Sequence, residues 1–106
     1  MSPASASSPS ENHLRLVARL AQLAPLRYTP AGLPAQDVLL EHESQQTEVD
    51  HVRRVALNLK AVAFGETALR LGRMSLGSRL RCTGFLAAAY RGKGVVFHLQ
   101  HIEPIE

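Results

Sequence analysis

The chain carries two tyrosines, and each has an arginine as its neighbour in the sequence. Tyr28 follows Arg27, and Tyr90 precedes Arg91. Proteins hold single-stranded nucleic acids with cations that follow the phosphates and with flat rings that stack on the bases. Both Tyr–Arg pairs have the residue types for this chemistry, so all four residues are candidate nucleic-acid contacts. The alternative is that each ring packs against its own loop.

A second group of candidates lies in residues 51–62, where apolar and polar side chains alternate. A period of two is typical of a half-buried strand, here with Arg54, Asn58 and Lys60 on its open face. Arg54 is the expected phosphate contact, and Asn58 shares its face. Arg53 points to the other face, but near the start of the strand it can reach a groove from the loop side. The alternative for each arginine is ordinary solvation.

Residues 90–94 form a glycine-rich basic connector. Arg91 and Lys93 alternate with Gly92 and Gly94, which predicts a mobile basic tip that closes over a nucleic-acid strand. The alternative is a turn whose charges only keep it solvated. The segment lacks the GxxxxGK[ST] pattern and a following helix, so it is not a phosphate-binding P-loop.

Patterns for catalysis or metal binding are missing from the sequence. Cys82 is the only cysteine, which excludes a disulfide framework and a cysteine-based zinc module. His98 and His101 are three residues apart, so on a strand they point to opposite faces and cannot chelate one ion together. Glu41 and Glu43 share a strand face, but no acid–base partner or nucleophile motif accompanies them. We expect no enzyme, no metal and no cofactor.

Length and composition predict one small, mildly basic domain. The chain has 106 residues and a formal net charge of +3, which permits a polyanionic partner without requiring one. Residues 1–11 form a Ser/Pro-rich segment that is expected to be a disordered tail, and residues 12–106 the folded domain. No apolar run is long enough to span a bilayer, and the N-terminal segment lacks the features of a signal peptide. A cytoplasmic location is expected.

Five strand candidates and one short helix follow from the periodicity and from the glycines and prolines. Residues 13–24 are ambiguous, since their apolar residues alternate as in a strand while their propensity favours a helix. Three prolines and one glycine make residues 25–34 a long loop, and residues 45–50 read as a polar loop. The other candidates are strands at 38–44, 51–62, 79–89 and 95–102 and a helix at 65–72.

That order predicts an all-β protein with a five-stranded Greek-key barrel, the OB-fold, with at most one short helix between strands three and four. Gly84 inside the fourth strand predicts a bulge or bend, as is common where a sheet closes into a barrel. Phe85 and Phe97 interrupt strand runs, and we expect both in the core, as well as Cys82.

Three segments of the sequence resemble the family of primosomal replication protein N of bacteria. They are the loop at residues 25–34 followed by the strand that ends in Glu41-His42, the segment at 76–86, and the ending at 101–105. The resemblance spans about residues 12–105, and it extends more distantly to the bacterial single-stranded DNA-binding protein family. It implies an OB-fold homodimer that binds single-stranded DNA and joins the primosome of replication restart as an accessory protein.

Two hypotheses follow from this resemblance, and a third, an RNA-binding OB-fold protein, stays open because stacking platforms accept both sugars. In the first, the chain is a non-enzymatic accessory protein that binds single-stranded DNA in a basic groove and bridges it to the restart helicase and other primosome proteins. In the alternative, it is a protein-interaction module whose DNA contact is weak or lost. The alternative is motivated by Ala56, which stands where family members carry a stacking aromatic residue, and by the short loop with only Arg91 and Lys93 as cations.

Overall fold

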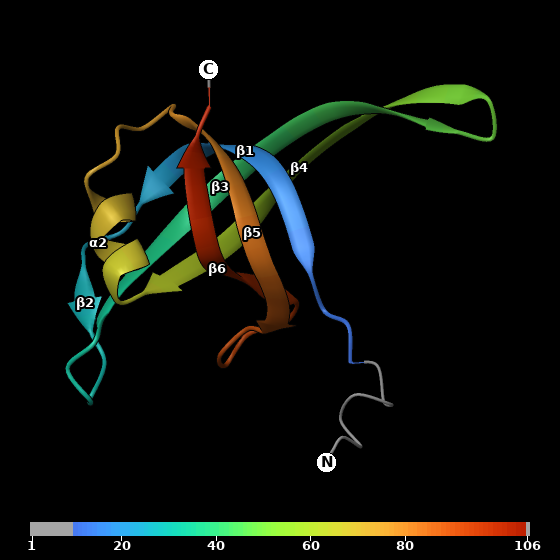
Figure 1. Ribbon diagram of the computed structural model, residues 1–106. Helices are drawn as coiled ribbons and strands as arrows, with labels where there is room; N and C mark the ends of the chain where they lie inside the picture. The colour runs from blue at the N-terminus through green and yellow to red at the C-terminus, as the bar shows by residue number, and fades with distance from the viewer. Residues whose placement is uncertain (1–9, 106) are drawn as a thin grey trace, which may run out of the picture.

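The computed structural model describes residues 10–105, in which six strands and one short helix follow one another (Figure 1). The predicted tail, residues 1–11, lies outside the described residues except for its last two positions. The elements are β1 (Leu14–Leu23), β2 (Arg27–Tyr28), β3 (Pro34–Glu48), β4 (His51–Phe64), α2 (Glu66–Gly72), β5 (Arg79–Ala88) and β6 (Val95–Pro104).

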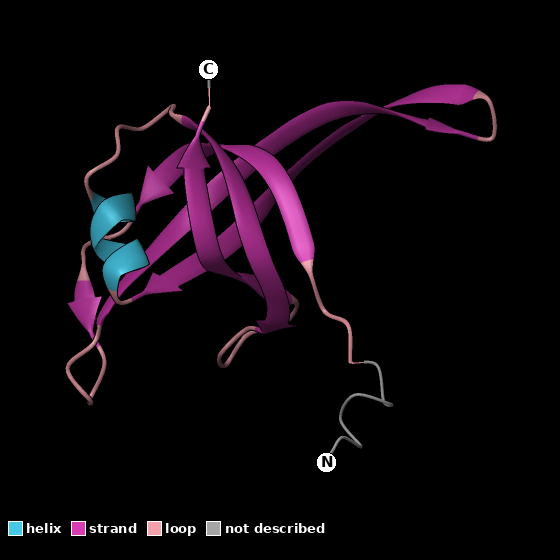
Figure 2. Ribbon diagram, viewed as in Figure 1, coloured by secondary structure: helices cyan, strands magenta, loops and turns pink. Residues whose placement is uncertain are grey.

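The five long strands close into a barrel (Figure 2). Their hydrogen-bonded order is β1-β5-β6-β4-β3, and β1 also pairs with β3, which joins the two ends of the sheet. The β4–β6 contact is parallel, whereas the other pairings are antiparallel. A closed five-stranded barrel with a helix between its third and fourth strands is the OB-fold. The predicted fold class is confirmed.

One apolar core fills the barrel, and helix α2 covers one end of it (Figure 2). Leu71 of the helix is fully buried, as are Cys82 and Phe97 from the strands, so the core prediction for these two is confirmed. Inward-facing residues alternate along each strand, as a small barrel requires. The buried core consists of Ala18, Leu20, Val38, Leu40, Ala61, Ala63, Ala68, Leu71, Leu80, Cys82, Phe97, Leu99 and Ile102.

The first strand shows how tertiary pairing overrides local propensity. The helix that propensity favours for residues 13–24 is wrong, and the alternating pattern is right. Strand β1 pairs with β5 from Leu14 to Arg19, and its second half crosses to pair with β3. A register shift between Leu20 and Gln22 bends the strand at this crossing. The barrel closes because β1 pairs with β5 in its first half and with β3 in its second half.

Two predicted loops contain strand structure. Within residues 25–34, the two residues of β2 pair with Pro34 and Ala35 at the start of β3. The loop expected at residues 45–50 is wrong, because β3 and β4 stay paired up to Glu48 and His51. Only Val49 and Asp50 remain as the turn, and both have positive φ, at 49° and 63°. A two-residue turn with this geometry fits the twist of the strands that it joins.

The paired strands extend well beyond the barrel as a two-stranded arm (Figure 1). We call residues 42–57 the β3–β4 arm. Strand β1 pairs with β3 no further than Glu41, and β6 pairs with β4 only at Ala61 and Val62. Both outer edges of the arm therefore lack a strand neighbour in the described chain. Val49 and Val52 near its tip are exposed.

At Gly84 the backbone of β5 lies very close to that of β6. The predicted bulge is confirmed, since the register of the two strands shifts between Thr83 and Gly84. A Cβ atom at residue 84 would lie 1.7 Å from the carbonyl oxygen of His98, which no side chain tolerates. Only glycine permits this approach.

Candidate nucleic-acid interface

The loop between β1 and β3 presents Arg27 and Tyr28 on one side of the barrel. A tight turn shapes its far end, where the Leu33 carbonyl accepts a hydrogen bond from the Thr29 amide at 2.8 Å. The Thr29 hydroxyl also accepts one from the Leu33 amide at 3.1 Å. Tyr28 is 64% exposed, so its ring does not pack into its own loop.

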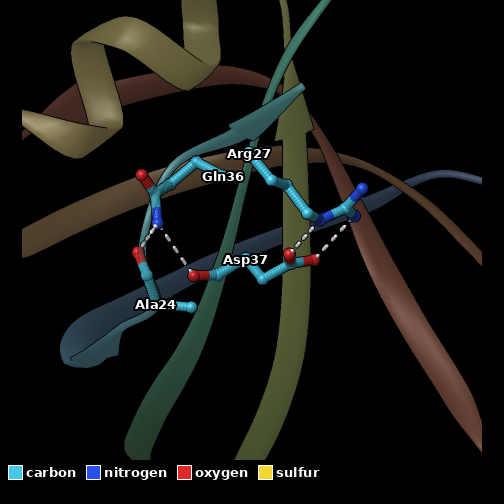
Figure 3. A network of polar contacts seen from close by, with 4 residues as sticks. All are labelled: Ala24, Arg27, Gln36 and Asp37. Carbon is cyan, nitrogen blue, oxygen red and sulfur yellow. Dashed lines mark hydrogen bonds and ion pairs between the residues drawn. The ribbon is translucent and has the colours of Figure 1, made fainter. Parts of the chain in front are cut away.

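A buried glutamine ties this loop to the barrel (Figure 3). The side-chain amide of Gln36 donates to the carbonyl oxygens of Ala24 and Asp37. Gln36 is 2% exposed, and a buried amide held by two carbonyl oxygens fixes the backbone on both sides of the loop. The position of Arg27 is thereby set relative to β3.

Arg27 forms an ion pair with Asp37 near the start of β3 (Figure 3). Its Nε lies 2.6 Å from Oδ2 of Asp37, and its Nη2 lies 3.1 Å from Oδ1. The hydrogen bond to Asp37 raises the pKa of Arg27, which is charged in any case, and Nη1 is left for another acceptor. The carboxylate nevertheless offsets the charge that a phosphate would meet.

The loop between β5 and β6 carries the other Tyr–Arg pair. The Gly94 carbonyl accepts a hydrogen bond from the Ala89 amide at 3.2 Å, which closes the loop. Tyr90 is 87% exposed, and the Arg91 guanidinium lies 5.5 Å from the centre of its ring. Arg91 and Lys93 form no ion pair with any described residue.

A groove of about 620 Å³ lies between these two loops, on the outer face of β3, β4 and β6. In OB-folds this face and the two flanking loops form the usual ligand site. Three predicted residues line it, namely Arg27, Tyr90 and Lys93. Tyr28, Arg53, Arg54, Asn58 and Arg91 lie outside its lining, so the structure brings only part of the predicted set together.

Three further lining residues carry a cation or an aromatic ring and were not among the predicted contacts. They are Lys60 on β4, Phe64 at the end of β4 and His98 on β6. Lys60 shares the outer face of β4 with Asn58 and has no ion pair among the described residues. The period-two pattern of residues 51–62 already placed Lys60 on this face, so the signal was present in the sequence.

The two arginines of the β3–β4 arm are held by glutamates of the neighbouring strand. Arg53 Nε lies 2.6 Å from a carboxylate oxygen of Glu48, and Arg54 Nη2 lies 2.8 Å from one of Glu43. Residues 41–58 contain four acidic and two basic side chains, so this stretch is net acidic. Its arginines offer less positive charge to phosphates than their number suggests.

Aromatic rings form a row across β4, β6 and β5 on the outer surface. The ring centres of Phe85 and His98 are 4.8 Å apart with an angle of 11° between their planes, and those of Phe64 and His98 are 6.0 Å apart. The expectation that Phe85 belongs to the core is wrong. It is half-buried and stacked on His98, because the alternation that buries Leu80 and Cys82 turns Phe85 outward.

The described part of the chain shows neither a cluster of metal-ligating side chains nor a helix that could span a membrane. No group of three or more His, Cys, Asp or Glu residues at residues 10–105 could hold a metal ion. No helix in that range is long and apolar enough to cross a membrane. The pKa of the buried Cys82 thiol is raised to about 11 by its burial, which makes it a poor nucleophile near neutral pH.

Comparison with known proteins places these features in a family. Residues 12–101 match the family described as another single-strand binding protein family. The replication restart protein PriB of Bordetella pertussis is 45% identical over 95 residues, which cover 89% of each chain. That of Nitrosomonas europaea is 36% identical and covers 89% of this chain and 88% of its own. These names describe binding and restart proteins, not enzymes.

Solved structures agree with the sequence matches. PriB from Ralstonia solanacearum superimposes with a TM-score of 0.86 at 36% identity, covering 92% of this chain and all of that one. The single-stranded DNA-binding protein of Thermus aquaticus shares the fold at a TM-score of 0.72 and 24% identity, covering 91% of this chain and 50% of its own. The chain is a member of the replication restart protein PriB family, with the OB-fold of single-stranded DNA-binding proteins.

Proposed function

We propose that this chain binds single-stranded DNA in the groove between its two Tyr–Arg loops and acts as a non-enzymatic accessory protein of replication restart. The observation that carries the proposal is the groove itself, which combines cations and an exposed ring. Lys60 and Lys93 line it without an acidic partner among the described residues, and Tyr90 stands at its rim. These are the two kinds of group that single-strand binding uses.

The predicted contacts define one path for the DNA strand across the groove and along the outer face of β4. Arg54, Asn58 and Lys60 share the outer face of β4, so a strand that leaves the groove along β4 meets them in turn. Tyr28 and Arg91 flank the groove from the two loops. Arg53 lies on the opposite face of the arm and reaches the path from its edge. In this arrangement the loops hold the bases, and the arm guides the phosphates.

The groove proposal is tested by fluorescence anisotropy of a labelled dT oligomer of about 30 nucleotides at low and moderate salt. We expect saturable binding that weakens with salt, with a log–log slope near −0.7 for each phosphate contacted. An oligomer that stays free at low salt, with folded protein in excess, would refute DNA binding as the function.

Partners beyond DNA complete the proposed role. The family membership supports contact with the restart helicase and other primosome proteins in the cytoplasm, where the chromosome is replicated. It also supports a homodimer, for which β1 offers a surface. From Leu14 to Ala18 this strand pairs with β5 on one side, and its other edge has no strand neighbour among the described residues. The Val17 carbonyl on that edge contacts Nδ1 of His42 at 2.6 Å, and the rest of the edge is available to a second copy. Light scattering that gives the mass of a monomer would refute the dimer.

A protein-interaction module remains the second candidate function. It is favoured by the ion pairs of Arg27, Arg53 and Arg54, which reduce the charge available to phosphates. On this reading a complex with the restart helicase persists when Arg27, Arg54, Arg91 and Lys93 are all replaced by alanine. Loss of the helicase complex in that variant, measured by co-elution of the purified proteins, would count against it.

A further inference from the structure

A second, smaller hollow adjoins the groove on the outer surface of the barrel. Its volume is about 310 Å³, half that of the groove. Val62, Phe64 and His98 line both hollows, so the two share one wall. Beyond this wall the second hollow is lined by Thr67, Phe85, Leu99 and Gln100.

Two rings of the shared wall, Phe64 and His98, belong to a row of stacked rings that continues to Phe85 inside the second hollow. Phe64, His98 and Phe85 come from β4, β6 and β5, which are neighbours in the sheet. His98 pairs with Val62 on one side and with Phe85 on the other, so the rings stand side by side on the same face. The close approach at Gly84 fixes the backbone of His98 against β5. Phe64 is 39% exposed and is open to a ligand.

The chemistry of the second hollow suits a nucleobase. Its lining contains aromatic and aliphatic groups, one hydroxyl from Thr67 and one amide from Gln100. An aromatic surface stacks with any base, while a hydroxyl and an amide pair with base edges of either polarity. None of its lining residues is acidic, so a nucleotide meets no like charge there. The neighbouring groove supplies the cations.

We propose that the second hollow is a base-binding subsite of the single-stranded DNA path. A nucleotide that leaves the groove past Phe64 enters this hollow, where its base packs against the rings of Phe64, His98 and Phe85. The inference rests on the proposed DNA binding and deepens it, because it extends the path around the barrel from β4 toward β5. The second hollow lies away from the two loops that flank the groove.

The absence of tryptophan from the chain allows a direct test. The single substitution Phe64→Trp introduces the only indole, and a base stacked against it quenches its fluorescence. We expect quenching that saturates as dT oligomers of 16 nucleotides or so are added, a length within the range that one OB-fold covers. The control is Leu69→Trp on α2, where the replaced side chain is 38% exposed and lines neither hollow. Its fluorescence should not change.

An affinity measurement complements the fluorescence. Phe64→Ala should weaken binding of the same oligomer about fivefold or more, as expected for the loss of one stacked base, while Leu69→Ala stays at the wild-type value. Wild-type binding with no quenching in F64W and no loss in F64A would overturn the subsite and leave the proposed function standing. Failure of the wild type to bind DNA would overturn both, so the two failures are distinguishable. Circular dichroism confirms that each variant is folded.

Discussion

Arg27 of β2 and Asp37 of β3 form a two-point ion pair on the rim of the groove, with contacts of 2.6 and 3.1 Å (Figure 3). Both residues line the groove, so the pair sets the charge at its entrance. The two side chains meet because the two residues of β2 pair with the start of β3. Within the proposed groove, the carboxylate of Asp37 therefore offsets the charge of Arg27.

Replacing Asp37 by Asn should strengthen DNA binding, because Arg27 is then released toward a phosphate. We expect a gain of about two- to fivefold at low salt, in line with the modest worth of an exposed ion pair. Anisotropy titrations with a labelled dT oligomer measure it. The control is Glu103→Gln, which removes the exposed partner of Arg81 outside the groove. Equal gains in both variants would mean that only the overall charge matters.

The turn of the β3–β4 arm stores strain at Val49. This β-branched residue has a φ of 49°, a conformation that asparagine and glycine adopt at lower cost. Val49→Asn should raise the free energy of unfolding by about 1 kcal/mol, which corresponds to about 4–8 °C in Tm for a domain of this size. The control is Val52→Asn, which replaces an exposed strand valine whose φ is not positive, and it should not stabilise. A melting curve of V49N that matches the wild type would contradict the strained turn.

Gly84 should be intolerant of any side chain. The Cβ atom of Gly84→Ala would lie 1.7 Å from the His98 carbonyl oxygen, so β5 and β6 would have to separate. We expect a loss of about 3 kcal/mol or more in urea unfolding. Gly92→Ala in the exposed loop between these strands, where φ is not positive, should cost far less. A fully stable G84A protein would show that the bulge is not needed for barrel closure.

Cys82 should make the stability depend on pH in the alkaline range. Burial raises the pKa of its thiol from 9.0 to about 11. The unfolded state therefore loses this proton at a lower pH than the folded state, and stability present below pH 9 is lost as the pH rises toward 11. We expect about 1 kcal/mol between pH 8 and pH 10, measured by urea unfolding. The loss should be smaller in Cys82→Ala, and an identical pH profile in both proteins would contradict it.

Much of the fold could be predicted because the alternation of buried and exposed side chains along a strand appears in the sequence as a period of two. Residues 51–62 and 79–89 alternate, and the prolines and glycines near residues 25–34 mark a loop. The length of the β3–β4 arm could not be predicted, since Gln45 and Glu48 are held by cross-strand hydrogen bonds without burial. Polar strands of this kind show no apolar period.

The site could be predicted only in part, for a related reason. Residue type indicated the cations and rings, and Arg27, Tyr90 and Lys93 do line one groove. The ion pairs of Arg53 and Arg54 depend on the register of β3 against β4, which the sequence does not specify. Hydrophobicity misled the prediction for Phe85, although the alternation of its strand placed it outside.

The most direct test of the DNA-binding groove is the salt-dependent affinity of Lys60→Ala/Lys93→Ala for a labelled dT oligomer of about 30 nucleotides. Both lysines line the groove and have no ion pair among the described residues. We predict at least tenfold weaker binding at low salt and a log–log salt slope that is shallower by about 1.4, or 0.7 for each lost phosphate contact. Arg73→Ala, outside the groove, should stay near the wild-type affinity. A double variant with wild-type affinity and slope would contradict the groove as the DNA-binding site.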